Sequence, residues 1–242
     1  MRLIKLGAIG STNDYLKELS GRQAVANFTT VTAENQTKGK GQMGSQWNSE
    51  AGKNLIMSIL IKDFLFDSQK IFDLNILVSV VVIEALEELN VPGLSLKWPN
   101  DIMSDHKKIG GILIENSFKS DGSIQSVVGL GLNVNQVNFD NLPKATSLAK
   151  ICHTEFDREA LLSAIVEKIK NFAAHWSKSS GVLWEAYANM LFKKGVPMPF
   201  AAAAGNQFMG IITGITKYGK LQILLEDGLL SDFDIKEITM LY

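Results

Sequence analysis

The spacing of hydrophobic positions predicts an α+β chain in its first half. Residues 28–33 are rich in β-branched side chains, which is typical of a strand, and Ser11 with Asp14 resembles the capping box of a short helix that ends at Gly21. Residues 68–90 are apolar almost all round, which favours a central helix packed on both sides. The other strands predicted here are residues 3–9 and 54–61.

The sequence pattern of the second half predicts antiparallel strands, then helices, then a small β unit. Short turns join the predicted strands at residues 94–98, 107–116 and 123–133, which favours antiparallel pairing. An amphipathic helix begins at Asp157, and a second helix is expected around residues 182–192. From Gly195 onward short β runs are divided by glycines, which indicates a barrel of about fifty residues. We therefore expect two domains, residues 1–193 and 194–242.

Composition narrows the class of protein. The 242 residues carry a formal net charge of -1, so no basic excess points to nucleic acid, and we expect no binding to DNA. Cys152 is the only cysteine, which excludes an intrachain disulfide and favours a cytoplasmic setting. The most apolar segment, residues 76–83, is far shorter than the ~20 residues of a membrane span, so no membrane partner is expected.

Residues 32–47, TAENQTKGKGQMGSQW, form a polar interval rich in glycine. Its glycines leave backbone amides free to face an anion, and Lys38 and Lys40 add positive charge. A flexible surface loop is the alternative reading of this composition. Trp47 at its end is either a stacking platform for a nucleobase or a core residue.

Two later segments carry glycines where strands are predicted. Gly110 and Gly111 are adjacent, while Gly129, Gly131 and Asn133 share one face of a strand. Two strands thinned in this way would accommodate a flat ligand lying across the sheet. The Ser11-Thr12-Asn13 run reads first as a helix N-cap, with a polar ligand at the helix N-terminus as the functional alternative.

Taken in order, the motifs are STN, GKGQMGSQW, G-K-N-L-x-x-S, KWPNDIM, KIGGILIE and GLGLNVN. This series resembles the biotin protein ligases, and the resemblance continues to the C-terminus. It implies an enzyme that joins biotin to ATP, giving biotinyl-5′-adenylate and pyrophosphate, and then biotinylates one lysine of a biotin carboxyl carrier domain. It also implies a mixed sheet with helices akin to class II aminoacyl-tRNA synthetases, followed by a small SH3-like barrel.

The resemblance also implies residue roles. Lys108 would neutralise the biotin carboxylate, and Asp101 would orient or deprotonate the acceptor lysine, with Mg²⁺ on the ATP phosphates nearby. The implied catalytic residues are Lys108, Asp101, Lys40, Asn100 and Lys97. The implied biotin-binding residues are Ser11, Thr12, Asn13, Gln36, Gly39, Lys108, Gly111 and Gly129. The implied nucleotide-binding residues are Lys40, Gln42, Trp47, Asn100, Lys108, Gly131 and Asn133.

The glycine loop departs from the arginine-rich pattern of that family. The arginine positions hold Lys40, Gln42, Met43 and Ser45, so we expect the adenylate to be held less firmly. A lipoate ligase or octanoyl transferase is disfavoured because an R-R-x-S-G-G-G pattern is missing. A catalytically dead adenylate-binding module is a further alternative. Some relatives carry an N-terminal DNA-binding domain, and we expect none here because the pattern starts by residue 3. The resemblance permits a monomer and a homodimer alike, and of the two we favour a homodimer.

Overall fold

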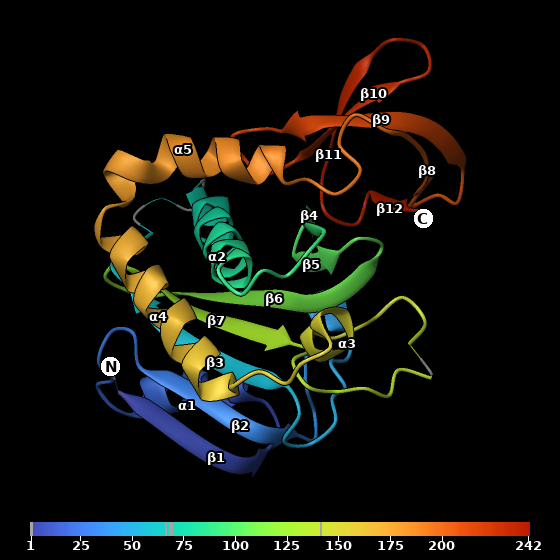
Figure 1. Cartoon of the computed structure of the whole chain (residues 1–242). Coiled ribbons are helices and arrows are strands. Elements are labelled where there is room, and N and C mark those ends of the chain that lie inside the picture. The colour runs from blue at the N-terminus through green and yellow to red at the C-terminus, as the bar shows by residue number, and fades with distance from the viewer. Residues whose placement is uncertain (1, 66, 68–69, 141) are drawn as a thin grey trace.

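A seven-stranded mixed sheet forms the centre of the molecule (Figure 1). The computed structural model describes residues 2–65, 67, 70–140 and 142–242. The strand order is β1-β2-β3-β7-β6-β5-β4, in which β1 and β2 are parallel and every other neighbouring pair is antiparallel. The strands are β1 (Leu3–Ile9), β2 (Thr30–Gln36), β3 (Leu55–Lys62), β4 (Leu94–Lys97), β5 (Asp101–Ser104), β6 (Lys107–Phe118) and β7 (Ile124–Leu132).

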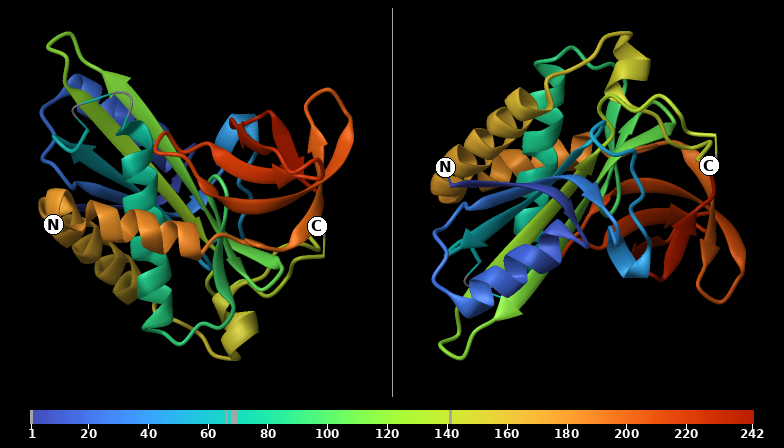
Figure 2. Two further views of the ribbon diagram at one scale, coloured as in Figure 1. Left: turned by 90° about the horizontal axis from the view of Figure 1, so that it is seen from above. Right: turned by 90° about the horizontal axis from the view of Figure 1, so that it is seen from below.

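Helices cover the two faces of this sheet unequally. Seen from above and from below, α1 (Thr12–Arg22) lies on one face, while α2, α4 and α5 lie together on the other (Figure 2). The helices of that second face are α2 (Ile71–Glu87), α4 (Arg158–Ala174) and α5 (Trp176–Asn189). The apolar circumference of α2 is buried between the sheet and the other two helices, which is why its sequence shows so little amphipathic character.

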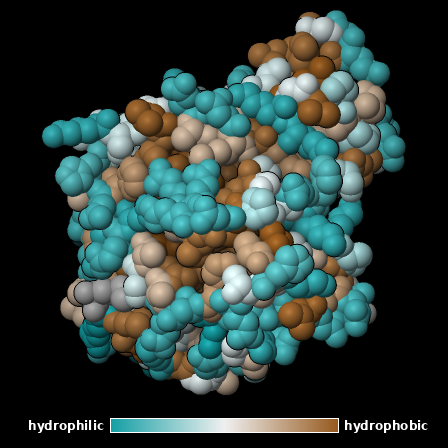
Figure 3. All heavy atoms as spheres, viewed as in Figure 1, coloured by the Kyte–Doolittle hydropathy of each residue, from teal (hydrophilic) through white to brown (hydrophobic). Residues whose placement is uncertain are grey.

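A five-stranded antiparallel sheet follows at one end of the molecule, in the order β11-β10-β9-β8-β12. Its strands are β8 (Pro197–Ala202), β9 (Gln207–Ile215), β10 (Leu221–Leu225), β11 (Leu230–Phe233) and β12 (Ile238–Met240). Apolar side chains reach the surface over its outer hairpin (Figure 3), where Leu229 and Leu230 are 62% and 57% exposed.

Most sequence predictions of elements are confirmed, with three corrections. The segment 101–104, predicted as part of a turn, is the strand β5, paired with both β4 and β6. The second late helix begins at Trp176, six residues before the predicted start, and the short helix α3 (Leu148–Cys152) was not predicted. Ser68, the expected first residue of the central helix, lies outside the described residues. Within the described residues, no helix is both long and apolar enough to cross a membrane.

The C-terminal sheet is joined to the segment between β4 and β5. The Trp98 indole is buried, and its Nε1 donates to the carbonyl oxygen of Gly219 in the β9–β10 turn at 2.8 Å. Gly219 has a φ of +82°, and a Cβ there would collide with the Phe72 ring of α2. Only glycine therefore fits this contact, which fixes the turn against the residues that precede Asn100.

Trp98→Phe is expected to lower the free energy of unfolding by about 1–3 kcal/mol, because the Gly219 carbonyl loses a buried donor and the smaller phenyl ring leaves part of the space of the indole empty. Urea unfolding measures the change. Tyr218→Phe is the control, since Tyr218 is 52% exposed in the same turn and should stay within about 0.5 kcal/mol of wild type. Equal stability of both variants would show that the indole hydrogen bond contributes nothing.

Candidate active site

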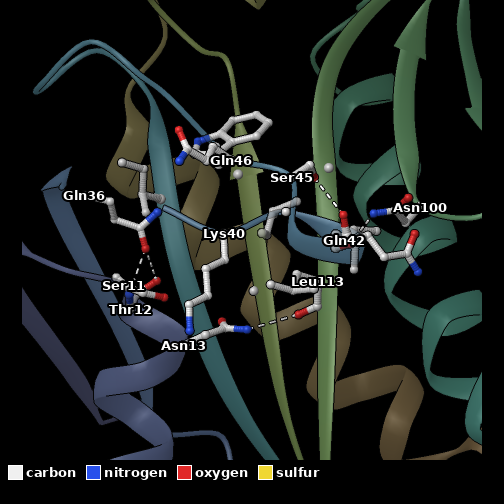
Figure 4. Close-up of a pocket in the computed structure, with 18 of the residues that line it drawn as sticks. Ser11, Thr12, Asn13, Gln36, Lys40, Gln42, Ser45, Gln46, Asn100 and Leu113 are labelled. Carbon is white, nitrogen blue, oxygen red and sulfur yellow. Dashed lines mark hydrogen bonds between the residues drawn. The ribbon is translucent and has the colours of Figure 1, made fainter. Parts of the chain in front are cut away.

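A cavity of about 240 Å³ opens on the α1 face of the large sheet, below the glycine-rich loop (Figure 4). Its walls are the N-terminus of α1, residues 40–47, and the central strands β3, β6 and β7. Residues far apart in the sequence meet here because β3 and β7 are neighbours at the middle of the sheet. The predicted site residues that line it are Ser11, Thr12, Asn13, Gln36, Lys40, Gln42, Trp47, Asn100, Asp101, Lys108, Gly111, Gly129 and Gly131.

One end of the cavity is built from neutral hydrogen-bonding groups. Ser11 caps α1 and accepts from the amide of Asp14, as predicted. The backbone N–H of Thr12 donates to Gln36 Oε1 at 2.7 Å (Figure 4). Thr12 and Asn13 are each only 3% exposed. Such an end suits an uncharged polar head group.

The other end carries charged groups. Lys108 Nζ lies 2.5 Å from Asp101 Oδ1, and Lys97 Nζ lies 3.5 Å from Asp101 Oδ2. A bulge in β6 between the partners of Ile102 and Met103 turns Lys108 toward the face of Gly111, three residues along the strand. A Cβ on Gly111 would lie 3.3 Å from Lys108 Nζ, so the two residues do share this face. Two lysines around one carboxylate leave net positive charge, which favours an anion here.

The segment that carries Asn100 and Asp101 is held from several sides. The Pro99 carbonyl oxygen accepts from Asn75 Nδ2 of α2 at 2.9 Å and from the Tyr187 hydroxyl of α5 at 3.3 Å. Asn100 Nδ2 donates to the carbonyl oxygen of Ile112 at 2.7 Å. These contacts place the Asn-Asp pair rigidly at the cavity wall.

Glycines shape the cavity because neighbouring side chains occupy the space where a Cβ would lie. The Trp47 ring lies on Gly131, where a Cβ would be 2.5 Å from the ring, and a Cβ on Gly129 would be 2.5 Å from Asn13 Oδ1. Trp47 Nε1 is buried without a hydrogen-bond partner among the described atoms. The ring thus lines the cavity next to the sheet, and Lys108 Nζ lies 5.9 Å from its centre.

Three predicted residues lie outside the cavity wall. A Cβ on Gly39 would collide with the Trp47 carbonyl, so this glycine permits close approach within the loop itself. Lys97 reaches the site only through Asp101. Asn133 is buried, and its Nδ2 donates to the carbonyl oxygen of Thr146 at 3.0 Å, so its amide joins two segments of the chain behind the site.

Lys40 is held at the outer rim by Asp14, with Nζ 2.7 Å from Oδ2. Partial burial by itself raises the pKa of the Asp14 carboxyl, but hydrogen bonds and charges from Lys40 and Lys17 outweigh burial and lower this pKa. Asp14 therefore stays ionised at neutral pH and keeps Lys40 at the rim.

Sequence reasoning missed three residues beside the site. Ser58 ends the G-K-N-L-x-x-S motif and touches both Thr12 and Asn13, and Glu115 ends the KIGGILIE motif and accepts from Asn13. Their place in those motifs was the available signal. The Tyr242 ring lies 5.1 Å from Lys97 Nζ, and burial followed by the charge of Asp101 raises the pKa of its hydroxyl, with Lys108 acting oppositely. No signal in the sequence placed Tyr242 there.

Protein ligands for a metal are sparse. The described residues contain no group of three or more histidine, cysteine, aspartate or glutamate side chains that could hold a metal ion. Asp101 is the one carboxylate on the described wall of the cavity. This donor set fits Mg²⁺ bound mainly through substrate phosphates and water, with one carboxylate beside it.

Known proteins resemble the chain over most of its length. Residues 7–133 match the biotin/lipoate A/B protein ligase family. The chain is 31% identical over 235 residues to the bifunctional ligase/repressor BirA of Bacillus subtilis, covering 94% of this chain and 70% of that protein. It is 27% identical over 215 residues to the biotin–[acetyl-CoA-carboxylase] ligase of Mycobacterium tuberculosis, covering 88% and 79%. The Aquifex aeolicus biotin protein ligase in complex with biotin and ATP matches with a TM-score of 0.81 at 28% identity, covering 99% of this chain and 98% of that one.

A cavity with neutral hydrogen-bonding groups at one end and Lys108 beside Asp101 at the other fits a ligand that has an uncharged head group next to an anion. With these matches, the chain belongs to the biotin/lipoate A/B protein ligase family.

Proposed function

We propose that this chain is a biotin protein ligase, which joins biotin to ATP and passes the biotinyl group from biotinyl-5′-adenylate to a lysine of a carrier domain. The observation that carries the proposal is the two-ended cavity, within a chain similar to biotin protein ligases over nearly its whole length. The neutral end would hold the cyclic urea of biotin, and the lysine end would hold its carboxylate and the α-phosphate of ATP.

Adenylate formation follows from the charges at the lysine end. Attack of the biotin carboxylate on the α-phosphate brings two anions together, and Lys108 lies where it offsets this repulsion. Asn100 donates to the protein backbone through Nδ2 and keeps its side-chain oxygen for the site. Lys40, once released from Asp14, and Lys97 add positive charge toward the leaving pyrophosphate.

Transfer to the carrier requires a neutral lysine amine. Asp101 is the carboxylate placed to accept its proton or to orient it, and it lies between Lys97 and Lys108. Trp47 supplies an aromatic face for adenine, beside Gly131 and Gln42. Ser11, Thr12, Asn13 and Gln36 surround the head group, with Gly111 and Gly129 beneath it. Mg²⁺ would accompany the ATP phosphates near Asp101, where it offsets their charge.

The finer features of the fold belong to the same proposal. The large sheet would correspond to a class II synthetase-like catalytic domain, residues 1–193, and the five C-terminal strands to an SH3-like barrel, residues 194–242. The change from the mixed seven-stranded sheet to the antiparallel five-stranded sheet near this boundary supports the division.

Transfer to an acceptor tests the whole proposal. The chain is incubated with ATP, Mg²⁺, biotin and a biotin carboxyl carrier domain, and intact-mass spectrometry follows the carrier. We expect the mass gain of one biotinyl group, lost when the acceptor lysine is replaced by arginine. An unmodified carrier would leave an adenylate-binding module as the better description.

Gln42→Arg is expected to slow the release of biotinyl-5′-adenylate by about tenfold, since a charge-assisted hydrogen bond to phosphate contributes about 1.5–3 kcal/mol. Gln42 lines the cavity beside Asn100, so an arginine there reaches the phosphate end. Rapid-dilution release of preformed adenylate measures the rate. Asn48→Arg is the control, because Asn48 is exposed just after the same loop and does not line the cavity. An unchanged release rate in Gln42→Arg would remove the link between the arginine-poor loop and weak retention.

A further inference from the structure

Ser58 on β3 lies directly behind the head-group end of the cavity. It is fully buried, and its Oγ lies 2.7 Å from Thr12 Oγ1 and 2.6 Å from Asn13 Oδ1. Its neighbour across the sheet is Gly129 of β7, whose missing side chain leaves the space that the Asn13 amide occupies. Ser58 is thus enclosed by protein on all sides and can act on a ligand only through Thr12 and Asn13.

Glu115 determines which way the Asn13 amide points. Asn13 Nδ2 lies 2.8 Å from Glu115 Oε2 and 3.3 Å from the carbonyl oxygen of Leu113 (Figure 4 shows the second contact). Both partners only accept hydrogen bonds, so the amide nitrogen must face them and the amide oxygen must face Ser58. Glu115 is itself held by Lys17, with Oε1 2.6 Å from Nζ.

The number of protons then determines the role of Thr12. Ser58 has one hydroxyl proton, and it goes to Asn13 Oδ1, which can only accept. Ser58 Oγ therefore accepts from Thr12, whose alternative acceptor is Gln36 Oε1 at 3.1 Å. In either case the Thr12 proton points to the protein, and a lone pair on Thr12 Oγ1 is left for the ligand.

We infer that Ser58 and Glu115 are positioning residues that make Thr12 a hydrogen-bond acceptor for an N–H of the ligand head group. The inference rests on the proposed function and extends it to the choice among acids. A cyclic urea offers ring N–H groups, whereas the dithiolane ring of lipoate and the alkyl chain of octanoate offer none. A ligand without such a donor leaves the buried Thr12 oxygen unpaired, which is how a polar site rejects an apolar competitor.

The test compares two ligands on one variant. Ser58→Ala is expected to lower the affinity for biotin about 10-fold to 100-fold, because Thr12 and the Asn13 oxygen lose their common partner. Isothermal titration calorimetry measures the affinity. Biotin methylated on its ureido nitrogens lacks the N–H donor, so it should bind the wild type weakly, and Ser58→Ala should lower its affinity by less than about threefold. At saturating biotin, kcat should stay near the wild-type value while KM for biotin rises.

Ser126→Ala is the matched control. Ser126 is a buried serine of β7 whose Oγ donates to Asn116 Oδ1 at 2.7 Å, away from the cavity, so biotin affinity should not change. Glu115→Ala is the second variant, which serves if Ser58→Ala fails to fold. It frees the Asn13 amide to turn, and it should also lower the affinity for biotin by a larger factor than the affinity for the methylated ligand.

Equal losses of affinity for biotin and for the methylated ligand would overturn the inference but not the proposed function. An unchanged affinity for biotin in both variants would do the same. A wild-type chain that binds no biotin at all would overturn the proposed function together with it.

Discussion

Lys108→Ala is expected to lower the rate of biotinyl-adenylate formation about 10²-fold to 10³-fold, with a smaller effect on biotin binding. Lys108 lies on the cavity wall beside Asp101, where the proposed mechanism brings the biotin carboxylate to the α-phosphate. Its charge offsets a repulsion that is greatest in the transition state, so removing it affects kcat more than KM. Single-turnover formation of labelled adenylate, at saturating biotin and ATP, measures the rate.

Lys107→Ala is the matched control for this experiment. Lys107 is the preceding residue of β6, but it is exposed to solvent and does not line the cavity. It should form adenylate at close to the wild-type rate. Equal rates in Lys108→Ala and Lys107→Ala would show that the position of Lys108 on the cavity wall has no role in adenylation.

Asp101→Asn is expected to slow transfer from preformed adenylate to the carrier lysine about 10²-fold to 10⁴-fold. A lysine amine has an ordinary pKa near 10.4, so it is charged at neutral pH and must lose a proton before it attacks. Asp101 is the carboxylate on the cavity wall, and asparagine keeps its shape but cannot accept a proton. Adenylate formation should fall far less, because Lys97 and Lys108 keep their charges.

Two separate assays therefore distinguish the roles of Asp101 and Lys108. The first follows adenylate formation in a single turnover, and the second follows transfer from adenylate supplied ready-made. Asp105→Asn is the control, since Asp105 is an exposed residue in the turn between β5 and β6, outside the cavity. Parallel losses in both assays for Asp101→Asn would assign Asp101 to the general geometry of the site and not to transfer.

Local patterns predicted most of the elements, and they failed where tertiary contacts decide. The apolar run of α2 and the capping of α1 by Ser11 are properties of short windows, and both are confirmed. The strand β5 is only four residues long and follows a Pro-Asn pair, so its pairing with β4 and β6 left no local periodicity to detect.

In the candidate site, too, local patterns predicted some features and failed where tertiary contacts decide. Motif order was enough to anticipate that Thr12, Lys108 and Trp47 meet, because glycine-thinned strands and a glycine loop leave a visible signal. Spacing alone could not show that the Asn133 amide is used by Thr146. Nor could it show that Ser58 lies behind Thr12, since that contact joins residues 46 positions apart.

Biotin-dependent exchange of pyrophosphate into ATP is the most direct test of the central claim, that this cavity activates biotin as an adenylate. The wild-type chain is assayed with Mg²⁺ and ATP in the presence of biotin, lipoate or octanoate. We predict rapid exchange with biotin and background exchange with the other two acids. Exchange with lipoate or octanoate at the biotin rate would contradict the head-group assignment. Tight biotin binding without exchange would contradict the claim that the chain is a ligase.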